Sequence, residues 1–152
     1  MSKDQLAKQI LSEHFKRWFK GDEEARRFAL ALWQAVQSWD DVIDNRDTSQ
    51  VNSVVSFFAF EVERYPFYQV HCRWLKPALI QAYLSWEAAN ALEAQPSGDD
   101  LNKAYVLRAQ IYSVFHLMAW LIDADHGVEL SADVWRSYSE RFQDCSGEFQ
   151  NA

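Results

Sequence analysis

The sequence predicts an all-α fold, a compact single-domain bundle of about six helices over residues 1–152. Three observations carry this prediction. Apolar residues recur at three- and four-residue spacing along most of the chain, and no alternating stretch competes with that period. Residues that suit helix N-caps precede these segments, and Gly or Pro follows them. Hydrophobic residues make up 49% of the chain and include seven Trp, which is enough for a packed core at this length.

The first two predicted helices have clear start and stop signals. Asp4 can cap the first helix, and Gly21 ends it. Asp22 opens the second helix, which runs to about Asn45 and has acidic residues in its first turn, where they suit the helix dipole. Both helices carry a stripe of large apolar residues and should therefore pack on a common core.

A third helix should start at Thr48 or Ser49 and end at Tyr65-Pro66, because the residue before proline avoids helical backbone. Its Val and Phe content also suits a strand. However, a lone strand among helices would have no partner, so the helix is favoured.

The second half of the chain begins with a short helical turn around Phe67 to Leu75. Pro77 suits the first position of a fourth, long helix that runs to about Ala94. Residues 95–99, Gln-Pro-Ser-Gly-Asp, form a loop that is too short to link two domains.

The fifth predicted helix runs from Leu101 to about Asp123 and is capped by Asp99 or Asp100. Its second half is apolar nearly all round, which places it at the centre of the bundle. Gly127 is expected to stop it. The last helix opens at Ser131 with Asp133, carries Val134, Trp135, Tyr138 and Phe142, and precedes a polar, flexible tail that covers residues 144–152.

Composition excludes several classes of partner. The net charge is −7 and the pI is near 5, whereas binding to nucleic acid or to an anionic membrane needs clustered Lys and Arg. Cys72 and Cys145 do not form a disulfide framework or a zinc site, which favours a reducing compartment. The N-terminus has no signal-peptide pattern, and the longest apolar stretch, Val114 to Ile122, is too short to span a membrane. We therefore expect a cytoplasmic protein.

Three carboxylates, Asp40, Asp41 and Asp44, lie close together at the end of the second predicted helix. Negative charge at a helix C-terminus opposes the helix dipole and costs energy unless a cation compensates it. A divalent metal ion could do so, and so could Arg46.

Other polar residues interrupt apolar stripes. Glu87 and Asn90 are predicted to face inward, in a sector with Leu79, Ile80, Tyr83 and Ala91, and a polar stripe runs along the fifth helix. In an antiparallel bundle these groups could surround one cavity and bind a metal ion with an anionic ligand. The predicted metal ligands are Asp40, Asp41, Asp44 and Glu87, and the predicted ligand-binding residues are Asn90, Arg108, Tyr112 and His116.

Each of these residues also has a structural interpretation. Asp47, and Asp44 with it, can cap the third helix. Glu87 and Arg108 can form an ion pair that braces two helices. His116 can be a hydrogen-bonded core histidine, and the side chains of Tyr105 and Tyr112 can be core aromatics.

The string Asp40-Asp41-Val42-Ile43-Asp44 resembles the aspartate-rich DDxxD motif of isoprenoid synthases. The resemblance implies that Asp40, Asp41 and Asp44 bind Mg²⁺ ions that hold a substrate diphosphate. The chain is also similar to all-α nucleotide pyrophosphohydrolases, in which two acidic pairs surround magnesium; here Asp41 and Asp44 would form one pair and Glu87 part of the other. The overall pattern looks like that of small proteins encoded by tailed bacteriophages, a likeness that brings no known activity.

Two functions follow as hypotheses. The first is Mg²⁺- or Mn²⁺-dependent binding or hydrolysis of a phosphorylated small molecule, a diphosphate or a nucleotide, with Arg108 stabilising phosphate charge. The second is a non-enzymatic, phage-encoded interaction or assembly protein in which the same polar residues form a buried ion-pair network. In that case surface Trp and Tyr residues would bind a protein partner or a second copy of the chain.

Overall fold

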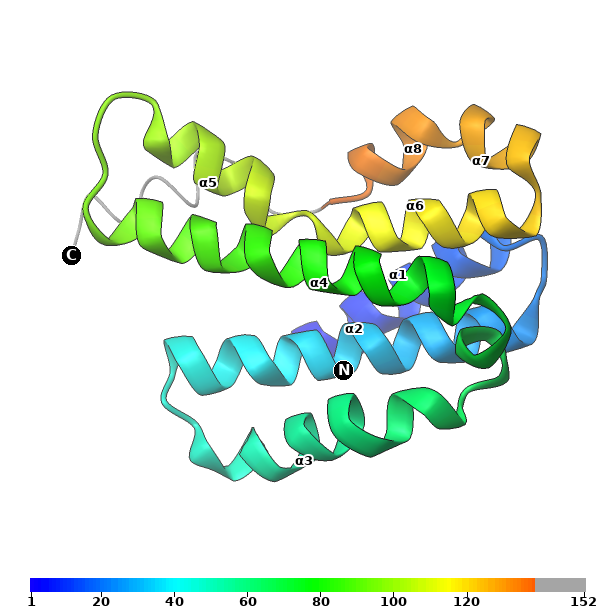
Figure 1. The fold of residues 1–152 in the computed structure, drawn as a ribbon, viewed down its shortest axis with the longest axis horizontal. Coiled ribbons are helices and arrows are strands. Elements are labelled where there is room, and N and C mark those ends of the chain that lie inside the picture. Colours follow the sequence, from blue (N-terminus) through cyan, green and yellow to red (C-terminus); the bar gives the residue numbers. More distant parts are fainter. Residues whose placement is uncertain (139–152) are drawn as a thin grey trace. The chain divides into compact units, whose positions relative to one another are not determined.

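A computed structural model describes residues 1–138, apart from the side chains of Lys3 and Asp4. Those residues are helical almost throughout and contain no strand, which confirms the predicted all-α class. The chain divides into two compact units, residues 1–72 and 73–152, and one long helix begins in the first unit and ends in the second (Figure 1). The predicted single domain stays a prediction, and the predicted tail and Phe142 lie outside the described residues.

The described helices are more numerous than expected, and most of them, α4 excepted, are shorter. The first unit holds α1 (Lys3–Trp18), α2 (Glu23–Asp44), the 3₁₀ turn η1 (Thr48–Gln50), α3 (Val51–Ser56), the π-helical turn η2 (Phe57–Glu61) and the 3₁₀ turn η3 (Val62–Arg64). Helix α4 covers Pro66–Ala94, and the second unit continues with α5 (Asp100–Arg108), α6 (Ile111–Ile122), α7 (Ala124–Glu129) and α8 (Ser131–Arg136).

The N-cap of helix α1 lies two residues earlier than predicted. Ser2, not Asp4, is the N-cap, and its hydroxyl accepts a hydrogen bond from the backbone N–H of Gln5, whose side chain in turn accepts from the backbone N–H of Ser2. This reciprocal pair is a capping box. At the other end Lys20 has left-handed backbone, with φ of 51°, and Gly21 N–H donates to the carbonyl of Lys16 at 2.9 Å, as in a Schellman motif. The predicted stop at Gly21 is therefore confirmed.

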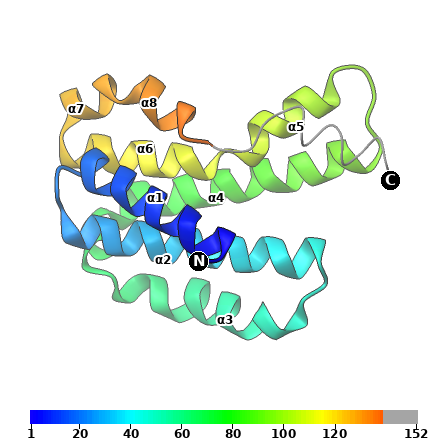
Figure 2. The same cartoon turned by 180° about the vertical axis from the view of Figure 1, so that it is seen from behind.

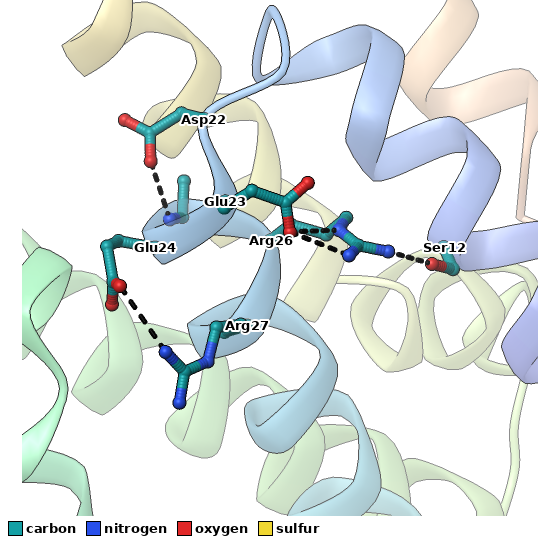
Figure 3. Close-up of polar contacts among 7 residues, drawn as sticks. Ser12, Asp22, Glu23, Glu24, Arg26 and Arg27 are labelled. Atoms are coloured by element: carbon teal, nitrogen blue, oxygen red, sulfur yellow. Dashed lines mark hydrogen bonds and ion pairs between the residues drawn. The ribbon is translucent and has the colours of Figure 1, made fainter.

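The N-terminus of α2 is held by short-range polar contacts (Figure 3). Asp22 caps it as predicted, accepting from the backbone N–H of Ala25 at 2.9 Å. The guanidinium of Arg26 donates to Glu23 at 2.7 Å and to the hydroxyl of Ser12, on α1, at 3.0 Å. These contacts thus fix the start of α2 after the turn and hold α1 against α2.

Aromatic rings form the core of the first unit. Phe28, on α2, is fully buried and lies 5.7 Å from both Tyr65 and Tyr68, measured between ring centroids. Phe15 and Trp18 of α1 are fully buried as well. Rings at these separations add to the hydrophobic gain from burial.

The third predicted helix is confirmed as helical, although it changes pitch three times, from 3₁₀ to α, to π and back to 3₁₀. Asp47 caps its first turn by accepting from the backbone N–H of Ser49 at 3.1 Å, as the structural interpretation of Asp47 predicted. The helix ends at Tyr65, whose ψ of 122° is extended because Pro66 follows.

Helix α4 corrects the predicted start at Pro77. It is one continuous helix from Pro66, so Pro66 takes the first position and Pro77 lies inside. Pro77 has no N–H to donate to the carbonyl four residues earlier, and such a residue usually kinks or breaks a helix. The segments on either side of Pro77 consist of good helix formers, and the helix continues through this position.

The predicted fifth helix is divided in two. Helices α5 and α6 are bent by 42° at a break where the N–H groups of Gln110 and Tyr112 bond three residues back, to Leu107 and Ala109. Taken together these two helices have the length and apolar composition of a membrane span, whereas no single helix within residues 1–138 does.

Helices α7 and α8 pack along α6 (Figure 2). Gly127 was predicted to stop the fifth helix, but α6 ends at Ile122 and Gly127 lies inside α7. A Cβ atom on Gly127 would meet the Cα of Trp120 at 2.6 Å, closer than such contacts occur. Glycine is needed here because α7 approaches the backbone of α6 directly.

Candidate functional site

The three aspartates predicted to bind metal lie at the last turns of α2. Asp40 is half-buried, Asp41 and Asp44 are exposed, and the side-chain amide of Asn45 donates to Asp41 at 3.3 Å. Among residues 1–138, no three His, Cys, Asp or Glu side chains come together in a way that could hold a metal ion. The predicted metal site therefore stays a prediction that rests on the sequence motif.

Glu87 does not face inward as predicted. It is exposed, and so are Ile80 and Tyr83 of the apolar sector that the sequence assigned to the interior. Leu75 and Ala89 are fully buried instead, so the inward face of α4 lies on its other side. The error has a physical cause: α4 carries apolar residues on nearly every face, and the period alone does not say which stripe is buried.

Arg108 takes part in an ion pair, but its carboxylate partner is Glu93 and not Glu87. Its Nε donates to Glu93 Oε1 at 2.6 Å, its Nη2 donates to Glu93 Oε2, and Nη2 also donates to Asn90 Oδ1 at 2.9 Å. The Arg108 and Glu93 side chains are only 18% and 7% exposed. This bidentate pair braces α4 against α5. Asn90 and Arg108, both predicted to bind a ligand, are instead hydrogen-bonded to each other between these two helices.

His116 joins α6 to the helices that follow. Its Nε2 lies 2.8 Å from the carbonyl oxygen of Gly127, so this nitrogen carries the proton and donates it. Ser131 lies 3.3 Å from the same nitrogen, but its hydroxyl donates to the carbonyl of Val128 at 2.7 Å. A Ser–His pair that activates a nucleophile needs the reverse arrangement, with the hydroxyl donating to the ring.

Tyr112 is a core aromatic residue. Its ring lies edge-on to Phe115 and to Tyr138, with centroid distances of 5.7 and 5.4 Å. Burial raises the pKa of its phenol to about 12. The neutral phenol is therefore favoured, as expected for a packing residue rather than for an acid or base at neutral pH.

A second set of residues, on an exposed side of α4, was not predicted from the sequence. Trp74, Ile80 and Leu84 are each about half exposed, between 49% and 53%. The exposed residues from 73 to 91 on the same side as these three are called the outer face of α4. They are Arg73, Trp74, Pro77, Ile80, Gln81, Leu84, Glu87, Ala88 and Ala91.

The outer face of α4 has the spacing of a helix-pairing surface. Trp74, Pro77, Gln81, Leu84, Ala88 and Ala91 are separated alternately by three and four residues. That spacing is the heptad pattern with which one helix packs along another. The signal was present in the sequence, but it could not be separated from the buried stripe of the same helix.

Comparisons with known proteins add no family to this picture. No family model matches the chain, and neither a curated protein nor a solved structure matches it.

Proposed function

We propose that this protein is a non-enzymatic interaction protein that binds a helix of a protein partner along the outer face of α4. The single observation that carries the proposal is the exposure of Trp74, Ile80 and Leu84 on one side of one helix. Scattered apolar residues on a surface are ordinary, but a contiguous aromatic and aliphatic face usually marks a site of association. Trp is also enriched where proteins bind proteins.

The polar residues first assigned to ligand binding support the same proposal. Arg108, Asn90 and His116 each bind a group on another helix of the second unit. An arginine that already binds a carboxylate in two places would have to give up that pair to bind a phosphate, and the buried carboxylate of Glu93 would then be left without compensation. These residues hold helices together, which accounts for them without a bound ligand.

A photoreactive amino acid tests this proposal. Benzoyl-phenylalanine at Leu84, in the protein expressed in its natural host, should form a covalent adduct with a protein upon irradiation. The matched control is Asn102, an exposed position of α5 outside the outer face. Adducts that form equally at both positions, or at neither, would overturn the proposal.

A further inference from the structure

The charges on the outer face of α4 are arranged symmetrically. Arg73 and Glu87 lie on the same edge of the heptad stripe, seven residues on either side of Ile80. All three side chains are exposed, and Arg73 lies over the Trp74 ring, with its guanidinium carbon 5.3 Å from the centroid. A two-fold axis that passes beside Ile80 would exchange the two charged positions.

We propose that the helix bound by the outer face of α4 is α4 of a second copy of this chain, running antiparallel. This inference rests on the proposed function and names its partner. In such a pair, Trp74 packs opposite Leu84 of the second copy and Pro77 opposite Gln81, so that large residues meet smaller ones in each layer. A two-fold interface is isologous, which means that each surface contacts the same surface of its partner.

Charge complementarity selects the antiparallel direction. Antiparallel pairing places Arg73 of one copy beside Glu87 of the other, twice, with Ile80 opposite Ile80 at the axis. Parallel pairing would instead place Arg73 beside Ala78 and Glu87 beside Leu92, since the flanking positions on the other edge carry no charge. Only the antiparallel arrangement gives both charged residues an opposite partner.

Charge exchange tests both the partner and its direction. The purified full chain should sediment as a monomer–dimer mixture, and Arg73→Glu or Glu87→Arg alone should weaken the dimer at least about tenfold, because each substitution places like charges in contact. The double variant should associate like the wild type. An equimolar mixture of the two single variants should also associate like the wild type, because a mixed dimer restores both opposite pairs.

Cysteine cross-linking provides an independent test of geometry. With Cys72 and Cys145 replaced by Ser, Ile80→Cys should form an intermolecular disulfide under oxidation. Leu84→Cys, a matched exposed residue of the same stripe, should not. The reverse result would show parallel pairing and overturn the antiparallel arrangement.

The two proposals can fail separately. A chain that is monomeric at all accessible concentrations, while position 84 still cross-links to a different protein, would overturn self-association and leave the interaction function intact. A monomeric chain with no adduct at position 84 would overturn both. The substituted residues within 1–138 are all exposed, so the variants should keep the helical circular dichroism of the wild type.

Discussion

The two units of this chain use polar side chains differently. In the first unit, Phe15, Trp18 and Phe28 fill the core, and the polar contacts around Asp22 and Arg26 lie at a helix end. In the second unit, polar groups cross between helices, from Arg108 to Glu93 and from His116 to the carbonyl of Gly127. Hydrophobic burial has no preferred direction, whereas hydrogen bonds do. Directional contacts therefore help to set the helix orientations at two places in the second unit, between α4 and α5 and between α6 and α7. In the first unit the contact from Arg26 to Ser12 lies at the end of an aromatic core.

The largest expected effect tests the aromatic core. Phe28→Ala should lower the free energy of unfolding by about 4 kcal/mol, because it leaves a cavity beside Tyr65 and Tyr68. Denaturant melts measure the loss, and hydrogen exchange should locate it in residues 1–72. Equal loss of protection in residues 73–138 would contradict the division into two units.

Gly127→Ala tests the close approach of α7 to α6. The added Cβ would meet the Trp120 backbone at 2.6 Å, so the helices must separate, at a cost of about 3 kcal/mol. Gly98→Ala is the control, since nothing lies within 4 Å of its Cβ position and only its φ of 57° opposes the change, by about 1 kcal/mol. Equal losses in thermal melts of the two variants would show that α7 can move away from α6 at little cost.

The buried phenol of Tyr112 should make stability depend on pH. Its pKa is about 12 in the folded chain and ordinarily about 10. Its contribution to the free energy of unfolding is therefore fully present below about pH 10 and is lost as pH rises towards 12. Between about pH 9 and about pH 12 the wild type should therefore lose about 2.5 kcal/mol more than Tyr112→Phe. Parallel pH profiles for the two proteins would show that the phenol ionises without cost and is not held in the core.

Glu93→Gln tests the directional contacts of the second unit. Removing this carboxylate leaves the largely buried guanidinium of Arg108 without its opposite charge and should cost about 2 kcal/mol. Glu87→Gln is the matched control from the same helix. Measured at a concentration where the chain is monomeric, it should change stability by less than about 0.5 kcal/mol because Glu87 is exposed. If Glu87→Gln were the more costly change, the pairing of Arg108 predicted from the sequence would be correct after all.

Magnesium should have the smallest effect. Asp41 and Asp44 are exposed, and water competes for the ion there, so about 5 mM Mg²⁺ should raise stability by less than about 0.5 kcal/mol. Asp40→Asn with Asp44→Asn should remove what effect there is. A rise of several degrees in the melting temperature, abolished by the double substitution, would establish the metal-dependent function predicted from the sequence and count against a purely interacting protein.

Local signals in the sequence determined most of the helices. The stop at Gly21, the caps at Asp22 and Asp47, and the break before Pro66 each depend on groups within a few residues, so they could be predicted without any knowledge of packing. The polar stripe of Arg108 and His116 was also visible, because the rest of that segment is apolar. The sequence likewise left open that Arg108 forms a structural ion pair.

Only the tertiary structure decided which faces and which partners these helices use. Glu87 and Glu93 lie on the same helix and are chemically identical, and which of them pairs with Arg108 depends on which apolar stripe of α4 is buried. Gly127 signals a helix end by local rules, yet the backbone of α6 beside it makes glycine necessary within α7. Local propensity acts within a turn or two of the chain, whereas the choice among several apolar faces is made by contacts between residues far apart in sequence, which no short segment encodes.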